Sequence, residues 1–144
     1  MDFQAFMKCN ALPVEDREVA VSKRFVDEDG KPLTWRIHAI TPEENEALQE
    51  QHTKLVPAPG KAGKRGQMVP RIDTGKYGAA LVAACVAYPD LNNAALQDSY
   101  GVKDAVSLLR NMLTPGELAD LQAEASDVCG FLTLDEQVET AKNS

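Results

Sequence analysis

Aromatic residues are scarce in this chain: they make up 6% of its 144 residues, and there is a single Trp. The interior must therefore be built mostly from Ala, Val and Leu. Basic residues are also in deficit, with 15 Lys and Arg against 22 Asp and Glu, which gives a formal net charge of −7. Since general nucleic-acid-binding proteins are expected to be basic, this balance argues against that class and against binding to anionic membrane surfaces.

Cysteines and long apolar runs are few as well. Cys9, Cys85 and Cys129 are odd in number and show no C-x-x-C spacing, which argues against a disulfide framework and against a zinc site. The apolar run "AALVAACVAY" is only about half of the ~20 residues that a membrane-spanning helix needs. The N-terminal "MDFQAFMKCN" has an acidic second residue and does not resemble a signal peptide. We therefore expect a soluble protein of the cytosol.

An alternation of apolar and polar residues predicts a β-hairpin over residues 17–40. The apolar positions on one side of the pattern are Val19, Val21, Phe25, Leu33, Trp35, Ile37 and Ala39. Between the two runs lies Asp29-Gly30, a pair that accepts the positive φ angles of a tight turn. A single hairpin is marginally stable, so its apolar face needs a further element packed against it.

A helix is predicted over residues 41–55. Thr41 is suited to be its N-cap, Pro42 its first residue and Glu44 the partner in a capping box. Because the segment is polar almost all round, we expect a peripheral helix or an interaction element. Residues 56–72 are rich in Pro, Gly and Lys and are predicted to be a flexible loop. Its basic stretch 60–66, "GKAGKRG", does not match a phosphate-binding loop, and a contact with an acidic partner is an alternative to a solvated role.

Residues 73–130 are predicted to form a compact helical core. A nearly all-apolar helix is expected to run through Tyr88 and to be stopped by Pro89, and Gly101 closes a short helix that follows. Thr114 and Glu117 predict a second capping box, and Gly130 ends the last core helix. Residues 131–144 are expected to form a frayed tail helix. The predicted class is α+β in a single domain, 1–144: a hairpin and a peripheral helix, then a mainly helical C-terminal bundle.

Residues with catalytic or metal-binding chemistry are not arranged in a motif. Neither His38 nor His52 has a Ser, Cys or His partner at a motif spacing. The run Asp27 to Asp29 lacks the alternating ligands and terminal Glu of a calcium-binding loop. We therefore expect no catalytic, cofactor-binding or metal-ligating residues, and no enzyme. A chain of this kind is better suited to binding another macromolecule.

The C-terminal half resembles a known family. An apolar helix ends in Pro-Asp-Leu, and a short helix with a Leu-Gln pair closes in Tyr-Gly. A Leu-Leu helix follows, and Pro-Gly-Glu opens the next helix, which ends in Gly-Phe. The residues are Pro89, Asp90, Leu91, Leu96, Gln97, Tyr100, Gly101, Leu108, Leu109, Pro115, Gly116, Glu117, Gly130 and Phe131. In order and spacing they resemble the XkdN-like phage tail assembly chaperones of tailed phages and prophages of Gram-positive bacteria, and the N-terminal half is also similar.

This resemblance implies a non-catalytic assembly factor. Such a factor would bind the tape measure protein, keep it soluble while the tail tube assembles, and be absent from the finished virion. The tail tube protein is a second candidate partner, and self-association is open. The location implied is the cytosol of the bacterial host. We expect Leu113, Leu118 and Leu121, in the C-terminal helices, to contact the partner.

Two other functions are considered beside this one. A structural virion component, such as a tail or head-completion protein, would be found in purified particles. A nucleic-acid-binding regulator would use Lys61, Lys64 and Arg65 and would show salt-sensitive DNA binding. The net charge of −7 counts against this last possibility.

Overall fold

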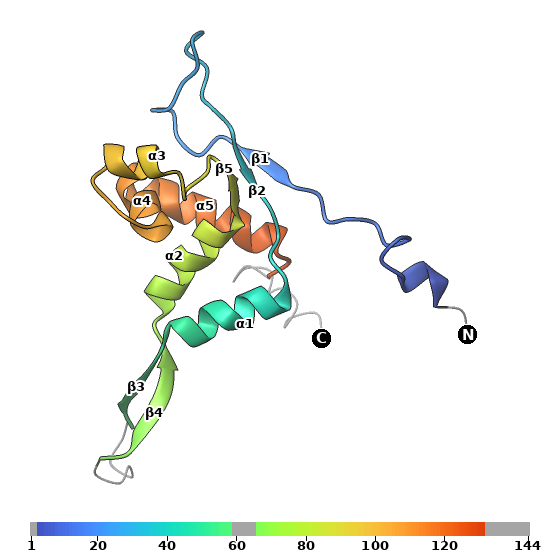
Figure 1. Ribbon diagram of the computed structural model, residues 1–144, viewed down its shortest axis with the longest axis vertical. Coiled ribbons are helices and arrows are strands. Elements are labelled where there is room, and N and C mark those ends of the chain that lie inside the picture. The colour runs from blue at the N-terminus through green and yellow to red at the C-terminus, as the bar shows by residue number, and fades with distance from the viewer. Residues whose placement is uncertain (1–2, 59–65, 132–144) are drawn as a thin grey trace, which may run out of the picture.

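The computed structural model describes residues 3–58 and 66–131 of the chain. It contains both strands and helices, so the predicted α+β class is confirmed. Figure 1 shows a helical body that carries a small sheet, a second β-hairpin that projects from this body, and an N-terminal arm that runs away from it. The tail helix predicted for residues 131–144 lies outside the described residues, apart from Phe131.

A three-stranded antiparallel sheet forms one side of the body. β1 (Arg17–Val19) pairs with β2 (Trp35–Ile37), so strand pairing within the predicted hairpin is confirmed. The other edge of β2 pairs with β5 (Val86–Tyr88), which follows much later in the chain. The strand order is therefore β1-β2-β5.

The strands of this hairpin occupy much less of residues 17–40 than the alternation predicted. Trp35 and Ile37 are buried, and their alternation with exposed Arg36 is the part of the pattern that the sheet uses. The long connection is ordered locally by Asp27, whose Oδ1 accepts hydrogen bonds from the backbone N–H of Asp29 and Lys31 at 2.8 and 2.9 Å. The Asp27 carboxylate therefore stabilises the turn at residues 27–31.

The first long helix of the body is shorter than predicted. α2 (Thr74–Cys85) begins after Asp73, which caps it, but the prediction that it continues to Tyr88 was wrong. Val86 to Tyr88 form β5, because their backbone groups pair with the free edge of β2. The residue before a proline is also disfavoured in helical backbone, and Pro89 follows Tyr88 directly.

α1 (Pro42–Gln51) has the predicted start and an earlier end. Thr41 and Glu44 form the capping box: Thr41 Oγ1 accepts from the Glu44 N–H, and the Glu44 carboxylate accepts from the Thr41 N–H, both at 3.2 Å. The helix ends before residue 55, the predicted end, because the chain enters a strand at Thr53.

The prediction of a flexible loop over residues 56–72 was wrong at both ends. β3 (Thr53–Pro57) and β4 (Met68–Ile72) form an antiparallel hairpin in full register. Figure 1 shows this hairpin projecting beyond α1 and α2, away from the sheet. Most of its side chains are exposed on both faces. The sequence therefore has no alternation of apolar and polar residues that would have predicted these strands.

Three further helices complete the body: α3 (Ala94–Ser99), α4 (Ala105–Met112) and α5 (Pro115–Val128). Their N-caps are Asn93, Asp104 and Thr114, each accepting a hydrogen bond from the backbone N–H three residues later. The predicted succession of four helices after residue 73 is therefore confirmed, with β5 inserted between the first and second.

The hydrophobic core lies between the sheet, α2, α4 and α5. Its largest fully buried side chains are Ile37, Val82, Cys85, Leu108, Leu109 and Leu121. Cys85 Sγ lies 3.6 Å from Cys129 Sγ, and burial raises the pKa of the Cys85 thiol to about 12. Cys85 therefore stays protonated at neutral pH and acts as a small apolar core residue.

Candidate partner-binding groove

An apolar groove opens on the body beside the end of β5. It has a volume of about 470 Å³ and is lined by the β1–β2 connection, the turn after β5, α3 and the end of α4. The lining residues are Phe25, Leu33, Thr34, Trp35, Tyr88, Pro89, Leu96, Ser99, Tyr100 and Met112. A concave apolar surface with a few polar groups at its edge is the usual form of a binding site.

The groove gathers a large share of the chain's rare aromatic side chains. Four of the eight aromatic residues line it: Phe25, Trp35, Tyr88 and Tyr100. Trp35 is buried beneath it, whereas Tyr88 is 55% exposed and Leu33 is 42% exposed. Phe25 and Tyr100 are partly buried against the core. Aromatic side chains are enriched at protein interfaces, and Tyr and Trp are common among the residues that dominate the binding energy.

The turn between β5 and α3 positions one wall of this groove. Asn93 Oδ1 caps α3 by accepting from the Leu96 N–H at 2.9 Å, and Gln97 Nε2 donates to the carbonyl of Leu91 at 2.8 Å. Gly101 closes α3 with a φ of 69°, a left-handed conformation that favours glycine. These bonds fix a helix of only six residues in place, so that Leu96 faces the groove.

Arg24 fixes the opposite wall to the helices. Its Nη2 donates to Glu117 Oε1 and to the carbonyl of Met112, both at 2.6 Å. Its guanidinium also lies 5.2 Å from the centre of the Phe25 ring, within cation–π distance. The β1–β2 connection is thus tied to the junction of α4 and α5, and Phe25 is held at the edge of the groove.

The Arg24 contact has a consequence for acid stability. Hydrogen bonds from Arg24, then from Ser22 and the Thr114 backbone, lower the pKa of Glu117 from 4.5 to about 2. A carboxyl with a lower pKa in the folded state stabilises the fold above pH 4.5, and this contribution is lost as the pH falls towards 2. We expect Glu117→Gln to lower the free energy of unfolding at pH 6 and to lower it less at pH 3, in urea titrations. A difference that did not change with pH would contradict this assignment.

None of the three leucines predicted to contact a partner lines the groove. Leu113 is buried, Leu121 is 1% exposed, and Leu118 is partly buried and packs against the core. Leu121 nevertheless lines a second open cavity of about 420 Å³, together with Val19 and Val21. The role of the three leucines in partner binding stays a prediction.

The other polar candidates have structural roles in the described part of the chain. His38 Nδ1 lies 2.9 Å from the carbonyl of Ala39, and His52 is the C-cap of α1. Among the described residues, no group of three His, Cys, Asp or Glu side chains could hold a metal ion. Lys61, Lys64 and Arg65 of the basic stretch 60–66 lie outside the described residues.

The sequence reasoning missed the groove residues because it assigned them elsewhere. Tyr88 was predicted to end a nearly all-apolar helix, and Phe25 to lie on the apolar face of a long hairpin. Tyr100 served only as the residue before a closing Gly. The one signal that could have found the groove is composition, since a chain with so few aromatics keeps several of them near turns.

The comparisons with known proteins establish the class. The family described as phage XkdN-like tail assembly chaperone protein matches residues 3–142, so this chain belongs to that family of phage tail assembly chaperones. The resemblance found in the sequence motifs is therefore confirmed. The family suggests a non-enzymatic role and protein partners in tail assembly.

Particular relatives agree with this assignment. The chain is 30% identical to the uncharacterized protein YqbN of Bacillus subtilis strain 168, over 99% of this chain and 93% of YqbN. It is 29% identical to XkdN of the phage-like element PBSX of the same organism, over 99% and 94%. The crystal structure of YqbN matches with a TM-score of 0.76 at 25% identity, over 92% of this chain and 98% of that chain.

Proposed function

We propose that this chain binds the tape measure protein of its phage or prophage and keeps it soluble while the tail tube assembles. The aromatic groove is the proposed contact, and no catalytic step is involved. The chain would act in the cytosol of the bacterial host and would not be kept in the finished virion. In the described residues, no helix combines the length and apolar character needed to cross a bilayer.

The observation that carries this proposal is the groove itself, in a chain that belongs to a family of tail assembly chaperones. Long apolar helices aggregate unless their apolar faces are covered, and an amphipathic helix is commonly bound in an apolar groove. The net charge of −7 helps to keep a complex of such a chain with an apolar partner dispersed.

Co-expression tests the proposal directly. The tape measure protein from the same genome, expressed alone, is expected to be found mostly in the insoluble fraction. With this chain present, we expect most of it to be soluble and to co-purify. Failure of the two proteins to co-purify would contradict the proposal.

Mass spectrometry of purified particles distinguishes a tail assembly chaperone from a structural virion component. A chaperone is expected to be absent from the particles, whereas a structural virion component is expected in stoichiometric amounts. Detection of the chain at the level of a tail protein would favour the structural role.

A further inference from the structure

The β3–β4 hairpin carries an exposed apolar face. Side chains alternate between the two faces of a strand, and residues that are paired across antiparallel strands share a face. The register of β3 and β4 therefore places five apolar side chains on one face: Leu55, Pro57, Met68, Pro70 and Ile72. All five are exposed, with Leu55 at 66%, Met68 at 48% and Ile72 at 37%. We refer to these five residues as the hairpin face.

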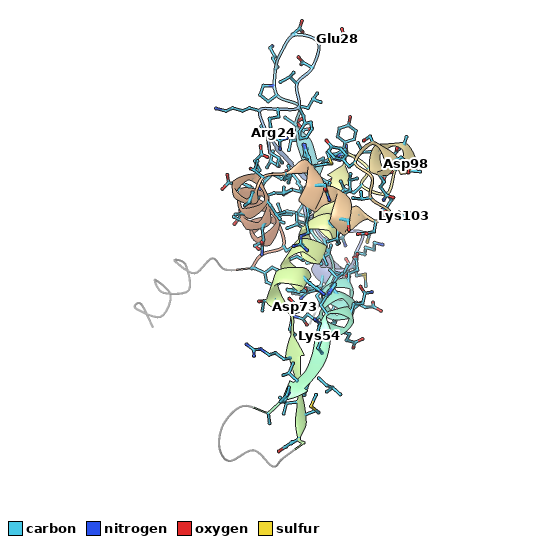
Figure 2. The ribbon with its side chains drawn as sticks, turned by 90° about the vertical axis from the view of Figure 1, so that its left-hand side faces the viewer. Arg24, Glu28, Lys54, Asp73, Asp98 and Lys103 are labelled. Carbon is cyan, nitrogen blue, oxygen red and sulfur yellow. The ribbon has the colours of Figure 1, made fainter. Side chains whose placement is uncertain are left out.

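The body of the protein does not support the hairpin face. None of the described strand residues, 53–57 and 68–72, belongs to the hydrophobic core or to the partly buried side chains packed on it. Figure 2 shows Lys54 and Asp73 near the root of the hairpin, and the rest of the two strands extends beyond them, away from the helices. A two-stranded hairpin is marginally stable unless an element packs on one of its faces. A protein that covered the hairpin face would therefore stabilise the strands that bind it.

The segment that forms the hairpin has a charge opposite to that of the rest of the chain. Residues 53–72 contain five basic side chains and no acidic one. The other residues have 10 Lys and Arg against 22 Asp and Glu, a formal net charge of −12. The acidic residues that flank the segment in the sequence, Glu50 and Asp73, lie outside the two strands. This separation of charge favours a partner that is attracted to the hairpin and not to the body.

Two cations lie opposite each other on the second face of the hairpin. Lys54 is the register partner of Arg71, and like charges directly opposite each other destabilise a sheet. Lys54 Nζ lies 3.5 Å from Asp73 Oδ2, an ion pair that compensates one of the two cations. Within the part of the chain that the structure describes, Arg71 takes part in no ion pair. Arg71 is exposed, so a carboxylate of a partner can reach and neutralise it.

We propose that the hairpin face is a second docking surface of this chain, and that it binds an acidic segment of another protein. Apolar side chains of that segment pack on Leu55, Met68 and Ile72, and its carboxylates are attracted by Lys54 and Arg71 on a ribbon only two strands wide. The inference does not depend on the occupant of the aromatic groove, which is lined by other residues.

The charges and the apolar face together select the kind of partner. A nucleic acid would be attracted by the basic residues, but contacts with phosphates make no use of five exposed apolar side chains. The body, with its net charge of −12, also repels a polyanion. The hairpin of a second copy would offer a matching apolar face, but the two basic segments repel each other. An acidic protein segment with apolar side chains fits both properties of the hairpin.

Binding of a synthetic peptide tests the inference. The probe is a peptide of about twenty residues that forms an acidic amphipathic helix, with Leu on one face and Glu and Ala elsewhere. All measurements use the full chain with Leu33→Asp, so that the aromatic groove does not contribute. We expect fluorescence anisotropy to give a micromolar dissociation constant at about 50 mM salt, and hydrogen exchange of the β3 and β4 amides to slow on binding. A peptide with Lys in place of Glu is expected not to bind.

Arg71→Glu and Lys103→Glu form a matched pair of variants. Arg71→Glu is expected to weaken binding of the acidic peptide at least tenfold, and so is the double variant Leu55→Ser, Met68→Ser. Lys103 is exposed on the body, and Figure 2 shows it apart from the hairpin. Its replacement makes the same change of charge and is expected to leave peptide binding unchanged.

Four results would overturn the inference. The first is no binding of the acidic peptide at about 1 mM, a concentration at which even a weak contact is populated. The second is equal binding by the Arg71→Glu and Lys103→Glu variants. The third is self-association of the chain that the hairpin variants abolish, since the partner would then be a second copy. The fourth is binding of duplex DNA, and not of the peptide, that Arg71→Glu abolishes. None of these results bears on binding of the tape measure protein.

Discussion

Replacing Leu33 by Asp is expected to lower the affinity of this chain for the tape measure protein by at least tenfold. Leu33 lies at the open side of the aromatic groove, where it is 42% exposed in the free chain. An apolar side chain of the partner that covered this position would bury the new carboxylate without a counter-charge, which is strongly unfavourable. The measurement is the dissociation constant of the purified pair, together with the soluble fraction of the tape measure protein on co-expression.

Leu55→Asp is the matched control for this variant. Leu55 is 66% exposed on β3, in the projecting hairpin, and receives the same chemical change. We expect it to bind and to solubilise the tape measure protein as the unmodified chain does. If both variants bound equally well, the groove would not be the contact. If Leu55→Asp alone lost binding, the β3–β4 hairpin would be the contact with the tape measure protein.

Replacing Leu121 by Ala is expected to cost about 2–5 kcal/mol of stability. Leu121 lies on α5, is 1% exposed and belongs to the hydrophobic core. Its removal leaves a cavity in a rigid, close-packed interior. Because small proteins are stable by about 5–15 kcal/mol in total, we expect a clear fall in the urea midpoint and in the melting temperature.

Leu12→Ala provides the comparison on the surface. Leu12 is 92% exposed in the arm, so its truncation is expected to change the free energy of unfolding by no more than about 0.5 kcal/mol. If Leu121→Ala unfolded at the same urea concentration as the unmodified chain, Leu121 would not be a core residue. The prediction that Leu121 contacts a partner would then gain support.

Capping chemistry was the part of the fold that the sequence predicted best. The starts of α1 and α5 follow from Thr41 with Glu44 and from Thr114 with Glu117, because each box satisfies backbone groups within four residues of chain. The end of α2 could not be predicted in this way. Whether Val86 continues a helix or enters a strand depends on the free edge of β2, which is far away in sequence.

The projecting hairpin shows a different limit. β3 and β4 have little buried surface, so no alternation of apolar and polar residues marks them. Pro57 and Pro70 further suggested a loop, since proline is rare inside sheets. Proline is tolerated here because a two-stranded sheet consists of edges alone, where one side of each strand needs no partner.

The groove could be predicted even less than the fold. Its residues come from segments that start at Phe25 and end at Met112, and no short motif connects them. The leucines predicted to contact a partner recur at helical spacing, which is the pattern of a core. A binding surface made where several chain segments meet has no spacing of its own, so only the folded arrangement reveals it.

The strand order β1-β2-β5 also has a consequence for the order in which the fold is completed during translation. Arg36 of β2 pairs with Tyr88 of β5, and all of α1, the projecting hairpin and α2 are synthesised between them. Until Tyr88 has been added, the nascent chain carries β2 with one edge unpaired and the groove with a wall missing. The groove also needs Leu96, Tyr100 and Met112, so the binding surface is completed only after α3 and α4 have been synthesised.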